Sequence, residues 1–222
     1  MIPKKVRDII TQWREEFKYH FIGKTFGAYT LNANNEIIHK GQVLEICDFM
    51  LDNKGELMLP FESCNLLKIE TYSAQKLKSF KNFPRTITAT VNTKKAVAFT
   101  SPGECKGVTS LEGIPSTIQG TLDLSSFHNL SLSKIDKHID SVKSIIPPYN
   151  YVGPVLSLLK IKNFPQKSIW FSSSWFTYAD DKNSARTQKL REIISYHLAN
   201  GKNIIACQEE LFKNGLDEYA KL

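Results

Sequence analysis

The chain has 222 residues, enough to bury a large hydrophobic core without disulfides or metals. Its 41% hydrophobic, 11% aromatic and 23% charged residues are typical of a globular protein and exclude a disordered, collagenous or coiled-coil chain. The sequence has no apolar run of about 20 residues and no apolar N-terminal stretch, so we expect a soluble protein made in a cytoplasm, with no membrane partner.

The first 22 residues carry apolar side chains at helical spacing. Trp13 and Phe17 lie on this apolar stripe, and Gly23 and Gly27 interrupt it. The spacing predicts an amphipathic N-terminal helix, within residues 1–22, that packs Trp13 and Phe17 against the rest of the protein. The full stripe consists of Val6, Ile9, Ile10, Trp13, Phe17 and Phe21.

Helical periodicity is absent from the next hundred residues and more, where short apolar segments alternate with turn residues. Several segments are rich in β-branched side chains, which favour strands. The predicted strands are residues 28–31, 43–46, 66–70, 86–91, 97–99, 121–124 and 142–146.

Part of this region repeats itself. Residues 80–87 (FKNFPRTI) align without a gap with residues 111–118 (LEGIPSTI). Residues 132–139 (LSKIDKHI) keep the apolar positions, and residues 161–165 (IKNFP) repeat the first half, so the units begin 31, 21 and 29 residues apart. Such spacing is typical of leucine-rich solenoids with insertions. We expect an α+β fold in which residues 23–170 form an irregular leucine-rich-repeat-like solenoid of short β-strands, although such apolar spacing also arises by chance in β-rich domains.

The last part of the chain returns to helical spacing. Leu190, Ile193, Ile194 and Leu198 form one apolar stripe, which Gly201 should end, and a second helix should follow Asn203. We therefore expect residues 171–222 to hold an aromatic segment and a C-terminal helical cap. Helices at both ends would cover the open ends of the solenoid, so that the chain forms one continuous unit.

Three stretches of the chain resemble a known group of proteins. Residues 108–124 (VTSLEGIPSTIQGTLDL), 152–162 (VGPVLSLLKIK) and 204–222 (IIACQEELFKNGLDEYAKL) resemble uncharacterised tailed-bacteriophage proteins with leucine-rich-repeat-like "TSLEG-P" units and a shared C-terminal helical tail. The resemblance implies a repeat fold and a bacteriophage accessory or virion protein, acting in the host bacterial cytoplasm or in the virion. The resemblance implies no particular activity, cofactor or catalytic residue.

Positive charge is concentrated in residues 66–106, which hold eight basic and two acidic residues of a chain with a formal net charge of +7. A basic surface attracts phosphates or acidic proteins, whereas the alternative is a solvated lysine-rich face. Tyr72, Phe80 and Phe83 would be available there for stacking on nucleic-acid bases.

A second candidate surface is the aromatic segment around residues 170–178. It either seals the junction between the last repeat and the C-terminal helices or, if exposed, anchors a partner. The predicted partner-binding residues of the two segments together are Lys78, Lys81, Arg85, Lys94, Lys95, Trp170, Trp175 and Tyr178.

No residue pattern indicates catalysis, a metal site or a cofactor. The four cysteines form no Cys-x-x-Cys pair, and Cys207 lies ten residues after His197 without further features of a nucleophile. We expect a non-enzymatic bacteriophage interaction protein, either a virion component or a host-directed anti-defence factor, that binds a phage or host protein through its repeats. The alternative is a nucleic-acid-binding protein using residues 66–106.

Overall fold

The computed structural model describes residues 2–20, 26–69, 71–88, 97–99, 105–148, 151–164 and 181–221. Five of the predicted partner-binding residues lie outside these ranges: Lys94, Lys95, Trp170, Trp175 and Tyr178. The position of the predicted aromatic segment is therefore outside the described residues as well.

The body of the protein consists of two columns of parallel strands. The first column contains β2 (Ile37–His39), β4 (Phe61–Cys64), β6 (Thr86–Ile87), β8 (Thr117–Asp123) and β9 (Ser141–Ile146). The second contains β3 (Leu44–Ile46), β5 (Leu67–Ile69) and β7 (Val97–Phe99), and β7 pairs with the second half of β8. Because β8 and β9 are long enough to belong to both columns, the two columns join into one nine-stranded sheet.

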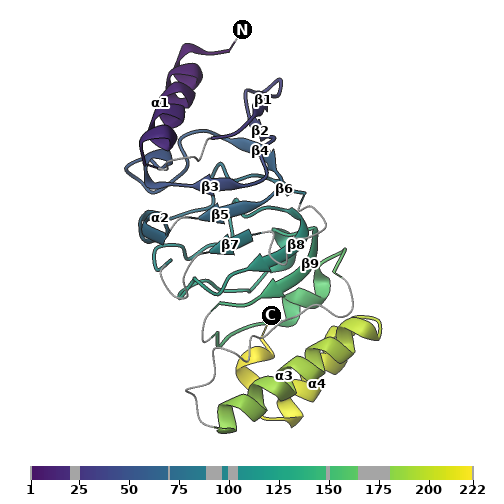
Figure 1. Ribbon diagram of the computed structural model, residues 1–222. Coiled ribbons are helices and arrows are strands. Elements are labelled where there is room, and N and C mark those ends of the chain that lie inside the picture. Colours follow the sequence, from purple (N-terminus) through teal and green to yellow (C-terminus); the bar gives the residue numbers. More distant parts are fainter. Residues whose placement is uncertain are drawn as a thin grey trace.

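Each turn of the chain contributes one strand to each column and then moves one strand along the axis. Figure 1 shows this progression, because the sequence colours change steadily from one end of the molecule to the other. The short antiparallel strand β1 (Tyr29–Leu31) extends the first column beyond β2. The fold is thus α+β, with a β-solenoid of about four turns.

Apolar side chains from successive turns stack on one another inside the solenoid. In the first column Ile87 pairs with Ile118, which pairs with Val142, and all three are buried. Leu44, Leu67 and Leu122 form a corresponding row in the second column. Side chains alternate between the two faces of a strand, so these rows face inward and the residues between them face solvent.

The N-terminal helix α1 (Lys4–His20) closes one end of this stack, as its apolar stripe predicts. Ile10, Trp13 and Phe17 are buried. The Trp13 ring lies parallel to that of Phe61 in β4, with centroids 6.1 Å apart, and Phe17 meets Phe49 of η1 (Asp48–Met50) edge to face. Figure 1 shows α1 at this end of the solenoid, where its buried aromatic side chains shield the first coil from water.

Two helices, α3 (Asp181–Ala199) and α4 (Ile204–Lys213), close the other end. The predicted stripe of α3 is buried, and both helices contact η3 (Leu156–Lys160), which lies on the last coil. The Lys202 ammonium, between the helices, donates to the Ile161 carbonyl at 2.7 Å. The chain then ends in η5 (Asp217–Tyr219), and Tyr219 donates to the Tyr151 carbonyl. No helix in the described ranges is long and apolar enough to span a membrane.

All seven strands expected from the sequence have a counterpart in the structure. Two further strands, β2 and β4, and the short helix α2 (Thr71–Lys76) were not predicted. The strand expected at residues 121–124 begins earlier, at Thr117.

The repeat alignment is correct for the first pair of units and for the turn that begins the third unit, but the strand of the third unit is shifted. Thr86 pairs with Thr117 and Ile87 with Ile118, as expected from the alignment of residues 80–87 with 111–118. The third unit would place His138 beside Thr117, whereas Ser141 lies there. The 3₁₀ helix η2 (Ile135–Lys137) takes up the three additional residues before the strand begins. Asn163 then pairs with Ser141, so the alignment of residues 161–165 is shifted too.

Candidate interaction surface

Five turns with the same local geometry connect the coils along one side of the solenoid. In each turn, a side-chain oxygen of the first residue accepts the backbone N–H of the third residue. The fourth residue of the turn has a positive φ angle. The acceptors are Asn32, Asp52, Ser79, Ser110 and Ser131. The residues with positive φ are Asn35, Gly55, Asn82, Gly113 and Lys134.

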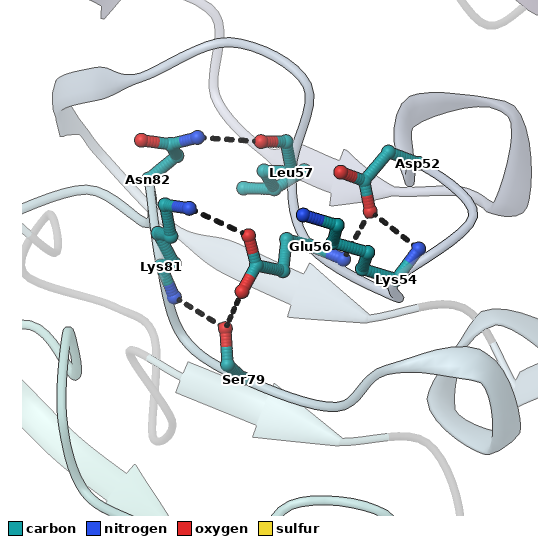
Figure 2. A network of polar contacts seen from close by, with 7 residues as sticks. All are labelled: Asp52, Lys54, Glu56, Leu57, Ser79, Lys81 and Asn82. Atoms are coloured by element: carbon teal, nitrogen blue, oxygen red, sulfur yellow. Dashed lines mark hydrogen bonds and ion pairs between the residues drawn. The ribbon is translucent and has the colours of Figure 1, made fainter.

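These turns stack on one another through polar contacts, which Figure 2 shows for two of them. The Asn82 amide donates to the Leu57 carbonyl at 2.6 Å. The Glu56 carboxylate accepts from the Lys81 ammonium at 2.8 Å and from the Ser79 hydroxyl at 3.5 Å. The turns are therefore linked across coils by side chains as well as by the sheet.

Basic residues form ion pairs with acidic residues of earlier coils: Lys76 and Lys81 reach the preceding coil, and Arg85 reaches the coil before that. Besides Lys81 with Glu56, the pairs are Lys76 with Asp48, and Arg85 with Glu36. The hydrogen bond from Lys76 lowers the pKa of Asp48, and the bond to Glu56 raises the pKa of Lys81. Three of the eight basic residues of this segment are thus paired with acidic residues from outside it.

The three basic partner-binding residues that the structure describes, Lys78, Lys81 and Arg85, differ in their ion pairing. Lys81 and Arg85 are exposed but ion-paired. Lys78 is exposed and forms no ion pair within the described part of the chain. Phe80 and Phe83, which the sequence suggested as stacking residues, are 1% and 3% exposed and belong to the core, so the expectation that they stack on bases is wrong.

An uncharged row runs along the outer face of the first column. Ser63, Thr86, Thr117 and Ser141 pair with one another from coil to coil, and all four are partly exposed. Each precedes a buried residue of the same strand, so its hydroxyl points away from the core. We call these four residues the hydroxyl row. The shared Thr before Ile in residues 80–87 and 111–118 was its signal in the sequence, and Ser63 and Ser141 were missed.

Two of the charged residues beside the hydroxyl row are ion-paired. Arg85, next to Thr86, is paired with Glu36, and Asp140, next to Ser141, accepts from Lys162 at 3.2 Å. Glu62, next to Ser63, accepts from the Asn32 amide, and Lys143 is exposed on the same face of β9 as Ser141. The four hydroxyl residues thus form an uncharged row with charged residues at its sides.

The cysteines have the properties of structural residues. Cys47, Cys64, Cys105 and Cys207 are buried and are not joined in disulfides. Burial, together with the nearby Glu210 carboxylate, raises the pKa of Cys207 to about 12, which disfavours the thiolate that a nucleophile needs. His197 is engaged with the Glu210 carboxylate at 2.9 Å, where it links α3 to α4.

The described residues contain no cluster of metal-ligating side chains. No group of three or more His, Cys, Asp or Glu residues in those ranges could hold an ion.

Comparisons with models of protein families, with curated proteins and with solved structures found no match to this chain. The class that the structure establishes is therefore a β-solenoid protein with helices at both ends.

Proposed function

We propose that this chain is a non-enzymatic bacteriophage interaction protein that binds another protein through the outer face of its solenoid. Its coils would be leucine-rich-like repeats, and its place of action the host bacterial cytoplasm or the virion. The likeness of residues 108–124, 152–162 and 204–222 to tailed-phage proteins supports this source.

The observation that carries the proposal is the hydroxyl row. Paired parallel strands hold Ser63, Thr86, Thr117 and Ser141 at intervals of about 4.8 Å, so a partner meets hydrogen-bonding groups already in place. Such preorganisation reduces the entropy lost on binding. Charged residues are depleted at the centres of protein interfaces, and the four residues of the row carry no charge.

Site-specific photo-crosslinking in infected cells tests the proposal. A benzophenone side chain at Thr86 or Thr117 should give one discrete cross-linked protein, whereas the same group at exposed Lys189 of α3 is the matched control and should not. Equal yields from all three positions, or no product from Thr86 and Thr117, would contradict the proposal.

Mass spectrometry of purified phage particles separates the two roles. Stoichiometric recovery of the protein supports a virion component. Its absence from particles, with the cross-link to a host protein, supports a host-directed anti-defence factor.

A further inference from the structure

A second surface, distinct from the hydroxyl row, brings together lysines from three successive coils. The Lys78 backbone N–H donates to the Gly55 carbonyl at 3.0 Å, which places Lys78 directly beside the turn that contains Lys54. A Cβ atom built on Gly107 would lie 2.5 Å from Lys78 Cδ and 2.7 Å from its ammonium nitrogen, so Lys78 also lies against the residue that follows Lys106. We call Lys54, Lys78 and Lys106 the lysine ladder.

The next coil places a histidine beside the last lysine of the ladder. Cys105 pairs in parallel with Phe127, and the Asn129 amide donates to the Lys106 carbonyl at 3.3 Å. His128, which is exposed, therefore follows Lys106 in register. These connecting segments thus present a lysine in each of three coils and a histidine in the fourth.

The ladder differs from the neighbouring basic residues in its pairing. Lys76, Lys81 and Arg85 each form an ion pair with a carboxylate of an earlier coil. Within the described residues, the three ladder lysines are exposed and form no ion pair. Asp52 interacts electrostatically with Lys54 without forming an ion pair, and its carboxylate accepts the backbone N–H groups of Lys54 and Glu56.

We propose that the lysine ladder binds the phosphate backbone of a nucleic acid. The three lysines come from the connecting segments of successive coils, so the ladder is a row of positive charges that suits a polymer with a charge on every unit. Gly55 and Gly107 leave no side chain on either side of Lys78, so a wide polymer can approach it. The inference goes beyond the proposed function, because it concerns another face and another class of partner.

Binding at the ladder should be independent of base sequence. Base recognition requires stacking or contacts to base edges, and the two described aromatic residues nearest in sequence, Phe80 and Phe83, are buried. Contacts to phosphates alone position a strand without distinguishing its bases.

Fluorescence anisotropy with labelled 20-nucleotide single strands and duplexes, titrated with salt, tests the proposal. Three phosphate contacts predict that the logarithm of the binding constant falls with the logarithm of salt with a slope of about −2 for a single strand and about −3 for a duplex. The dissociation constant at low salt should be about 10⁻⁴ M or lower.

The double variant Lys78→Gln, Lys106→Gln should reduce the magnitude of the slope to about one third, since one of three contacts remains. Lys81→Gln, which removes an ion-paired lysine of the same segment, is the matched control and should leave the slope unchanged. Thermal unfolding should show that all variants are folded.

Three outcomes would overturn the inference: no binding at low salt, an equal loss of binding in Lys81→Gln, or displacement of the oligonucleotide by an equimolar acidic peptide. The last would indicate an acidic protein partner instead. Photo-crosslinking from Thr86 in the Lys78, Lys106 variant keeps the two proposals apart, because the protein interface should survive the loss of the ladder.

Discussion

His39 is a buried histidine held in a single tautomer. Its ring is 3% exposed, and Nε2 donates to the Phe26 carbonyl at 2.6 Å. Because a carbonyl only accepts, the proton is on Nε2, and Nδ1 is left as a buried acceptor without a partner among the described residues. Burial lowers the pKa of His39, since the charged ring would be poorly solvated beside the aromatic ring of Phe26.

This lowered pKa predicts that the protein loses stability in mild acid. Unfolded histidine has a pKa of 6.5, so between that value and the lower folded pKa the unfolded chain binds a proton that the native protein does not. The contribution of neutral His39 is therefore complete above pH 6.5 and is lost as the pH falls toward the folded pKa. Thermal melts at pH 7.5 and 5.5 should show a larger fall in Tm for the wild type than for His39→Gln. Equal falls would mean that His39 is not the group responsible.

At the scale of the element, the stacked turns depend on residues that adopt positive φ angles. Gly113 has φ +81°, and a Cβ atom there would lie 2.7 Å from the Phe80 carbonyl oxygen of the preceding turn. Gly201 has φ +88° and nothing within 4 Å of such an atom. Alanine at Gly201 therefore measures backbone strain alone, and alanine at Gly113 measures the same strain plus a collision with the preceding turn.

Gly113→Ala should lower the free energy of unfolding by about 2–3 kcal/mol, and Gly201→Ala by about 1 kcal/mol, since only the first adds a collision with backbone to the strain. Urea denaturation measures both changes. If both substitutions cost the same, the turns at residues 79–82 and 110–113 are not in contact.

The N-terminal helix should act as a cap whose main contact is the buried ring of Trp13. Trp13→Ala removes a fully buried ring and should cost about 3–5 kcal/mol. Trp13→Phe is the matched control: it keeps an aromatic ring beside Phe61 and removes the indole N–H, which has no partner among the described residues. It should cost less than half as much, as urea denaturation would show. Similar losses for both variants would contradict ring packing as the basis of the cap.

Elements with a strong local signal were predictable from the sequence, and those formed by pairing between coils were not. The stripe of α1 and the β-branched segment of β9 are visible in the chain itself. β4 contains Glu62 and Ser63 and has no β-branched residue, so its strand conformation comes from pairing with β2 and β6. The same limit applies to the candidate surface, because the ion pair of Arg85 with Glu36 spans 49 positions.

The whole molecule is a stack in which each coil contacts mainly its neighbours, so every surface feature depends on the register between coils. A shift of three residues in one coil would move His138 into the hydroxyl row in place of Ser141. The repeat pattern in the sequence favours that shifted register, because residues 131–135 (SLSKI) resemble 110–114 (SLEGI) and the inserted 3₁₀ turn has no clear signature.

Engineered disulfides test this register most directly. Thr117 and Ser141 are partners in adjacent parallel strands, about 4.8 Å apart, which is within the range that a disulfide can bridge. The four native cysteines are buried and should not interfere. Mild oxidation should therefore cross-link the variant Thr117→Cys, Ser141→Cys, detected by intact mass and by mapping of the linked peptides, and should leave Thr117→Cys, His138→Cys unlinked. A cross-link in the second variant without one in the first would contradict the stacked solenoid described here.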